Sequence, residues 1–130
     1  MRHGFTLIEL MVTIVILGGL IAIVGPNVFR IQYDADRDTA EMQMANLAGA
    51  VKLWTVRHRR LPERLEQICE AETEGGEALL ERLPLDPWDS PYEYERLGGK
   101  RFRIVSLGED RQAGTDDDLT WPDSIEEPMS

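Results

Sequence analysis

The stretch GFTLIELMVTIVILGGLIAIVG, residues 4–25, decides the fold of this chain. Its apolar part carries a single charged side chain, Glu9. An α-helix of about 20 residues is about 30 Å long, which matches the hydrocarbon core of a bilayer. A secretory signal peptide would end in a small-residue cleavage site of the Ala-x-Ala type, and none follows here. The sequence therefore predicts a membrane-spanning helix, and Arg2 and His3 before it favour a cytoplasmic N-terminus with the rest of the chain translocated.

Glu9 needs an explanation, because a carboxylate inside hydrocarbon costs about 3 kcal/mol or more. One explanation is that Glu9 lies near the interface, where its side chain reaches the polar headgroups. The other is that Glu9 meets a cation inside the membrane. Cleavage between Gly4 and Phe5 would create such a cation, a new α-amino group that could pair with Glu9 of a neighbouring copy.

This N-terminal pattern resembles a known signal. Gly4-Phe5-Thr6-Leu7-Ile8-Glu9, followed by an apolar helix, is similar to the class III signal of type IV pilins and pseudopilins. The resemblance implies a leader at residues 1–4 that a prepilin peptidase removes. It also implies N-methylation of Phe5 and pairing of Glu9 with the N-terminal amine of an adjacent subunit.

The apolar segment at residues 5–26 is predicted to be interrupted by Gly18, Gly19, Gly25 and Pro26, since proline removes a helical hydrogen bond. Pro26 either marks the end of the membrane segment or, as the resemblance implies, lets the helix bend inside a filament.

Residues 27–60 are predicted to form the second half of the long helix. One apolar stripe recurs at helical spacing and should be buried against a globular part. Its members are Met44, Leu47, Ala48, Val51 and either Trp54 or Leu53. Arg57 to Arg60 place positive charge at the end of the helix, where its dipole favours cations.

Residues 61–130 are predicted to form a globular head. Leu61-Pro62 should end the long helix, and short helical pieces should follow. Tyr92–Glu95 alternates like a strand, Gly98-Gly99 supplies a turn, and Phe102–Ser106 reads as the return strand. This small antiparallel sheet should bury aromatic and aliphatic side chains against the helix: Tyr92, Tyr94, Phe102 and Ile104.

Three stretches of the head resemble the major pseudopilins of type II secretion systems: LDPW at 85–88, PYEY at 91–94 and SLGED at 106–110. The resemblance implies an α+β fold of the type IV pilin kind. A long N-terminal helix, transmembrane in its first half, would pack on a small antiparallel β-sheet with a C-terminal metal-binding loop.

The segment SLGEDRQAGTDDDL, residues 106–119, is strongly acidic. Ca²⁺ takes about six to eight oxygen ligands, and Asp110, Thr115 and the aspartates at 117–118 could converge if Gly114 lets the loop fold back. Three consecutive aspartates do not match the EF-hand pattern. The spacing by itself favours a solvated loop over a cation site.

The resemblance to major pseudopilins implies instead a structural Ca²⁺ in the loop after the last strand. The implied ligands are oxygen atoms from carboxylates, one hydroxyl and two backbone carbonyls: Asp110, Asp117 and Asp118, then Thr115, then Leu107 and Gln112. A shift of the loop by one residue would exchange Asp116 with its neighbours, so the choice among 116–118 stays open.

Composition limits the function. The formal net charge of −10 argues against nucleic acid as a partner. Cys69 is the single cysteine, which excludes an intrachain disulfide and a cysteine-based zinc site within one chain. We see no Ser-His-Asp or Cys-His arrangement, and therefore expect no enzyme.

The leading expectation is a structural subunit of the type II secretion pseudopilus. It would be a single-pass protein of the inner membrane with a periplasmic head, polymerising into a helical filament that drives exoproteins through the outer membrane. The implied partners are other copies, minor pseudopilins, the inner-membrane assembly platform and the prepilin peptidase. One alternative is a type IV pilin in adhesion or DNA uptake, although those commonly carry a disulfide loop. Another is a membrane-tethered, Ca²⁺-dependent binding module that never polymerises.

Overall fold

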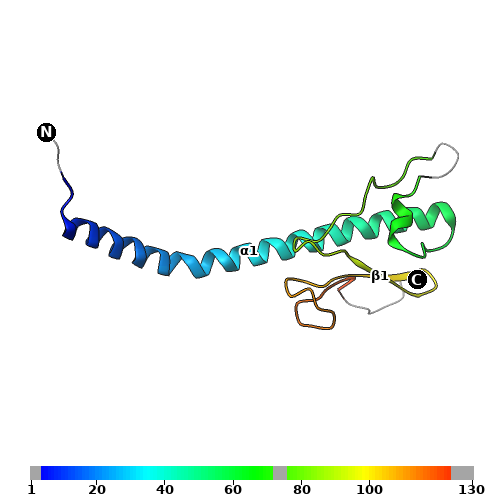
Figure 1. Cartoon of the computed structure of the whole chain (residues 1–130). Helices are drawn as coiled ribbons and strands as arrows, with labels where there is room; N and C mark the ends of the chain where they lie inside the picture. The colour runs from blue at the N-terminus through cyan, green and yellow to red at the C-terminus, as the bar shows by residue number, and fades with distance from the viewer. Residues whose placement is uncertain (1–3, 72–75, 124–130) are drawn as a thin grey trace. The chain divides into compact units, whose positions relative to one another are not determined.

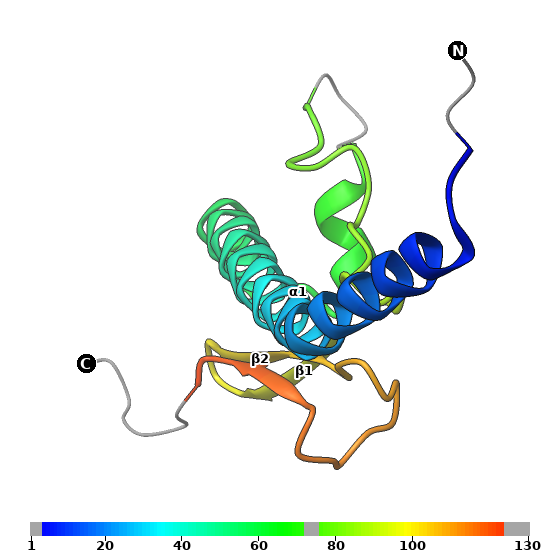
Figure 2. The same cartoon turned by 90° about the vertical axis from the view of Figure 1, so that its left-hand side faces the viewer.

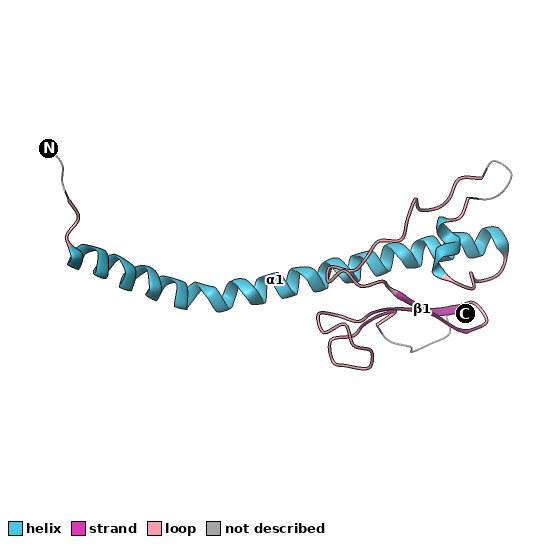
Figure 3. Ribbon diagram, viewed as in Figure 1, coloured by secondary structure: helices cyan, strands magenta, loops and turns pink. Residues whose placement is uncertain are grey.

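The computed structural model describes residues 4–71 and 76–123. Its elements are, in chain order, α1 (Leu7–His58), the 3-10 helix η1 (Leu65–Cys69), β1 (Glu93–Gly98), β2 (Arg101–Ser106) and β3 (Leu119–Trp121), as Figure 3 shows. The chain divides into two compact units, Met1–Ala35 and Asp36–Ser130, which are described in turn.

The described part of the first unit consists mainly of the N-terminal portion of α1. Its large apolar side chains are exposed from Phe5 to Ile31, all around the helix. A helix that is apolar on every face needs a lipid or protein environment to cover it. In the part of the chain that the structure describes, α1 alone is long and apolar enough to cross a membrane by length and composition.

The predicted interruption of α1 is not present in the structure. The helix continues through Gly18-Gly19 and through Gly25-Pro26, with Pro26 inside it. Proline removes one hydrogen bond from the ladder, and helix propagation on both sides is cooperative enough to continue past it. A role for Pro26 in bending the helix within a filament stays a prediction.

α1 ends at His58, slightly before the predicted stop at Leu61-Pro62. Arg59 follows in the left-handed conformation, with φ of 59°. The residue in this conformation after a helix is usually glycine, and the left-handed backbone ends the helix and changes the direction of the chain. His58 stacks on Trp54, one turn earlier, with ring centroids 3.9 Å apart.

The core of the second unit is built on the predicted stripe of α1. Within the described residues of that unit, α1 contributes Ala40, Met44, Leu47, Ala48, Val51 and Trp54 to the buried cluster. Leu53 is 48% exposed, so Trp54 continues the stripe. Figures 1 and 2 show the strands along one side of this cyan-to-green part of α1, with η1 along another.

The sheet has three strands in the order β1-β2-β3, antiparallel throughout. β1 and β2 form the predicted hairpin, with Tyr94 opposite Ile104 and a register shift between Arg96 and Gly98. Gly98 and Gly99 both have positive φ, which the tight turn requires. Tyr92, Phe102 and Ile104 are buried as predicted, and Tyr94 is half-buried with its hydroxyl donating to the Pro62 carbonyl at 2.9 Å.

The third strand was not predicted. β3 pairs with β2 through Ile104–Trp121, Val105–Thr120 and Ser106–Leu119. The acidic loop therefore does not follow the last strand. It connects β2 to β3, and both of its ends are held in the sheet.

The segment between α1 and the sheet is less helical than expected. In its described residues only η1 is helical, with Leu65 and Ile68 buried. Leu79 and Leu80 then both donate their amides to the Ile68 carbonyl, at 3.1 and 3.3 Å, so the chain returns along η1 as a loop.

Candidate functional site

The start of α1 places the predicted cleavage position next to a capped helix end. Thr6 and Glu9 form a reciprocal pair: the Glu9 amide donates to Thr6 Oγ1 at 3.3 Å, and the Thr6 amide donates to Glu9 Oε2 at 3.2 Å. This is a capping box, which satisfies two amides that have no partner within the helix. Gly4 and Phe5 lie outside the helix, exposed, immediately before this cap.

The capping box gives Glu9 a second role beside the predicted interaction with a cation. Its carboxylate accepts a hydrogen bond within the same chain, while the side chain stays exposed. A capping function and an interaction with a cation are compatible, because a carboxylate has about four acceptor positions. T-x-x-E is also readable in sequence as a helix start, and Thr6 is the residue that was missed.

The loop between β2 and β3, residues 107–118, contains the six predicted ligand residues. It begins with a tight approach between Gly108 and Asp117. A Cβ on Gly108 would lie 2.3 Å from the Asp117 carbonyl oxygen, and Gly108 has φ of +71°. Only glycine fits there without a shift of the backbone. The two ends of the loop are therefore in contact through backbone atoms.

Side chains of the loop fold it onto its own backbone. Asp117 Oδ2 accepts from the Asp110 amide at 3.2 Å, and Asp110 Oδ1 accepts from the Gln112 amide at 3.0 Å. The Thr115 hydroxyl donates to the Gln112 carbonyl at 3.2 Å. Asp118 Oδ2 accepts from the amide of Gly114, at 2.7 Å.

These contacts bring the predicted ligands into pairs: Asp110 with Asp117, and Thr115 with Gln112. Asp118 joins them through Gly114, and Leu107 is half-buried at the end of β2. Asp116 is exposed, unlike its half-buried neighbours Asp117 and Asp118.

The donor chemistry of the loop fits a hard cation. Carboxylate, hydroxyl and carbonyl oxygens are the ligands that Ca²⁺ prefers. Asp118 Oδ1 is buried and has no hydrogen-bond partner, an arrangement that is costly unless something else satisfies the oxygen. Across residues 4–71 and 76–123, no three acidic, histidine or cysteine side chains come together as a metal-binding group. A cation here would therefore rely on backbone carbonyls and Thr115 as well as on carboxylates.

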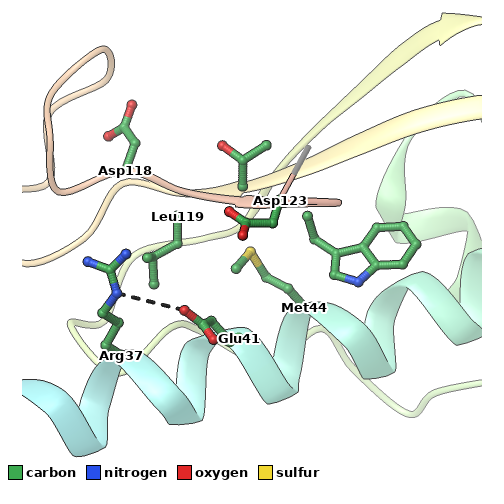
Figure 4. Close-up of a pocket in the computed structure, with 8 residues that line it drawn as sticks. Arg37, Glu41, Met44, Asp118, Leu119 and Asp123 are labelled. Carbon is green, nitrogen blue, oxygen red and sulfur yellow. Dashed lines mark ion pairs between the residues drawn. The ribbon is translucent and has the colours of Figure 1, made fainter. Parts of the chain in front are cut away.

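A cavity of about 360 Å³ lies nearby, between α1 and β3. Figure 4 shows Arg37 and Glu41 on the helix, joined by an ion pair with Nε and Oε1 3.7 Å apart. In the same view the Asp118 carboxylate points away from the helix, toward the loop. Asp118 therefore lines the cavity with its backbone, while its carboxylate contacts the loop.

Comparison with known proteins decides the family. Residues 1–25 match the prokaryotic N-terminal methylation motif, and residues 27–121 match the type II secretion system protein G family. The chain belongs to the protein G family. The chain is 37% identical over 130 residues to the type II secretion system core protein G of Aeromonas hydrophila, and the match covers 91% of the chain and 90% of that relative. It is 33% identical over 130 residues to core protein G of Escherichia coli K12, covering 92% and 90%.

A solved structure confirms the fold of this chain. The crystal structure of the major pseudopilin from the type 2 secretion system of enterohaemorrhagic Escherichia coli aligns with a TM-score of 0.62. The alignment covers 73% of this chain and 93% of that one at 24% identity. The predicted long helix on a small antiparallel sheet is thereby confirmed, while the metal in the loop stays a prediction.

Proposed function

We propose that this chain is the structural subunit of a type II secretion pseudopilus, a filament that drives exoproteins through the outer membrane. The exposed apolar portion of α1, most of which lies within the methylation motif at residues 1–25, carries the proposal. Such a surface is unstable in water. It is stable in a bilayer before assembly and against other copies of the same helix in a filament.

The proposal includes processing, location and partners. The chain is cut between Gly4 and Phe5 by a prepilin peptidase, and Phe5 is N-methylated. The subunit then spans the inner membrane once with its head in the periplasm. It assembles with other copies and with minor pseudopilins on an inner-membrane platform. Its role is structural, and no reaction is assigned to it.

Processing gives a direct test of this proposal. Mass spectrometry of filaments sheared from the native host should show chains that begin with N-methylated Phe5. A Gly4→Leu variant, with a branched side chain at the cleavage position, should keep residues 1–4 and yield no filaments although it still reaches the membrane. Native chains that begin at Met1 and occur only as membrane-bound single copies would favour a tethered module that does not polymerise.

We further propose that the loop at residues 107–118 holds a structural Ca²⁺. Asp110, Asp117 and Asp118 would supply carboxylates, Thr115 a hydroxyl, and the carbonyls of Leu107 and Gln112 the remaining ligands. The bound cation would offset the repulsion among the carboxylates and tie β2 to β3. The buried, unpartnered Asp118 Oδ1 supports this assignment.

Removal of the cation should lower the stability of the head. The unfolding of the full chain in detergent can be followed by the fluorescence of Trp54, Trp88 and Trp121, which all belong to the second unit. Ca²⁺ at about 100 times its Kd stabilises a folded protein by about 2.7 kcal/mol, which corresponds to a rise in Tm of about 10 °C or more for a head of this size. EGTA should reverse the rise.

Two matched variants sharpen this measurement. Asp118→Asn should abolish the Ca²⁺-dependent rise in Tm, because its carboxylate is proposed as a ligand. Asp116→Asn, the same change two residues earlier at an exposed position, should preserve the rise. A wild-type Tm that EGTA leaves unchanged would remove the Ca²⁺ assignment.

A further inference from the structure

Asp86 is a buried carboxylate that the proposed function does not yet use. It is 3% exposed and lies in the LDPWDS segment between η1 and β1. Asp86 Oδ1 accepts from the amides of Trp88 and Ser90, at 3.1 and 2.7 Å. These bonds close a turn, which the Ser90 carbonyl completes by accepting from the Asp86 amide at 2.9 Å. The turn uses only Oδ1 of the carboxylate, so Oδ2 is available for a contact elsewhere.

The second oxygen reaches a distant part of the chain. Asp86 Oδ2 accepts from the Ser106 hydroxyl at 2.7 Å, and both residues are buried. Ser106 is the last residue of β2. Its Oγ also accepts from the Gly108 amide at 3.4 Å. Asp86 therefore holds a serine that in turn holds the first turn of the loop at residues 107–118.

The contact between Gly108 and Asp117 extends this connection across the loop. Gly108 is buried and packs so closely on the Asp117 backbone that no side chain fits between them. A rotation of residues 106–108 would therefore move Asp117 as well. A charge-assisted hydrogen bond to a buried carboxylate is among the stronger constraints available for fixing such a rotation.

We propose that Asp86 is the positioning residue of the loop, fixing through Ser106 and Gly108 the orientation of the Leu107 carbonyl and of Asp117. The expected effect of Asp86 on Ca²⁺ affinity rests on the proposed Ca²⁺ site in the loop at residues 107–118. Its expected effect on the conformation of the loop rests on the hydrogen bonds alone. Residues that orient metal ligands from outside the ligand set typically change metal affinity by about 10- to 100-fold when they are replaced.

The test compares two identical substitutions in one turn. Asp86→Asn keeps an oxygen that can accept from Trp88 and Ser90, but it places an amide group where the carboxylate accepted from Ser106. Asp89→Asn changes an exposed carboxylate three residues away and serves as the control. Full-length protein in detergent should lose about 10- to 100-fold in Ca²⁺ affinity with Asp86→Asn and stay near the wild-type affinity with Asp89→Asn.

A Ser106→Ala variant tests the path of the effect. It removes the hydroxyl that connects Asp86 to Gly108, so it should lower Ca²⁺ affinity as Asp86→Asn does. The double variant should be no weaker than either single variant, because both changes break the same connection. Additive losses would overturn the proposed path from Asp86 through Ser106.

Hydrogen exchange without metal separates this inference from the Ca²⁺ proposal. Asp86→Asn should speed exchange at the amides of Asp110 and Gly114, which the loop carboxylates hold, more than at amides of β1. If the wild type binds no Ca²⁺, the cation proposal fails, and this local exchange still decides the role of Asp86. Unchanged exchange in the loop, with only a uniform loss of stability, would overturn the positioning role.

Discussion

Glu9→Gln is expected to abolish filament formation while α1 and its N-terminal cap stay intact. Glutamine can replace glutamate in a capping box, so the bonds between positions 6 and 9 can be kept. What is lost is the negative charge that we propose pairs with the amine of Phe5 in a neighbouring subunit. Removing one partner of a buried ion pair costs about 3–5 kcal/mol, which lowers an association constant by more than about 100-fold.

The measurement is the yield of sheared filaments, with membrane insertion checked by extraction of the membranes at high pH. Glu9→Ala serves as the comparison, because it removes both the charge and the cap. If Glu9→Gln assembles like the wild type and only Glu9→Ala is defective, Glu9 acts as a helix cap and the proposed pairing with the amine is wrong.

Gly108→Ala should destabilise the head more than the same change at Gly114, the other glycine of the loop. The new Cβ would lie 2.3 Å from the Asp117 carbonyl oxygen and 2.7 Å from the Asp117 Cβ. Left-handed backbone costs a non-glycine residue about 1–2 kcal/mol, and overpacking costs about 1–3 kcal/mol more. For a head of this size we expect a fall in Tm of about 10–30 °C.

Gly114→Ala is the matched control within the same loop. Gly114 also has a positive φ, of 81°, but nothing lies within 4 Å of an added Cβ. It should therefore lose only the backbone contribution, about 1–2 kcal/mol. The loss of stability is measured by tryptophan fluorescence during thermal unfolding. Equal losses in the two variants would show that the close approach of Gly108 to Asp117 adds nothing to the cost of the substitution.

The helix stripe and the hairpin could be predicted because both are local patterns. Met44, Leu47 and Val51 recur with the period of a helix, and Gly98-Gly99 lies between two strand-like segments. The choice between Leu53 and Trp54 was left open, although helical spacing favours Trp54, which lies three residues after Val51 and seven after Leu47. Packing decided it in favour of Trp54.

β3 could not be predicted, since it has three residues and directly follows a run of aspartates. β3 can pair with β2 only if the loop at residues 107–118 reverses the direction of the chain, and no local sequence pattern indicates this reversal. The role of Asp86 was missed for the same reason. Its carboxylate joins residues 20 positions apart, and no local pattern marks that contact.

The roles predicted for the signal sequence and for the loop both come from resemblance. Gly4, Phe5 and Glu9 lie within a matched methylation motif at residues 1–25, and their roles stay predictions, as do the ligands of the loop. The structure adds Thr6 and Gly108 as residues with defined contacts in these two regions. T-x-x-E before an apolar helix is the sequence pattern that indicates Thr6. A glycine just after a strand is the pattern that indicates Gly108.

The hydrogen bond between Tyr92 and Gln43 joins residues 49 positions apart, and it has a consequence for biogenesis. The apolar stripe of α1 is synthesised early, but the strands that cover it come from the last third of the chain. During synthesis the stripe therefore emerges long before its cover, and the head can fold only in a late, cooperative step. A chain that stops before β2 would leave the stripe exposed to proteases, so under the proposed function truncated subunits would be removed before they could enter a filament.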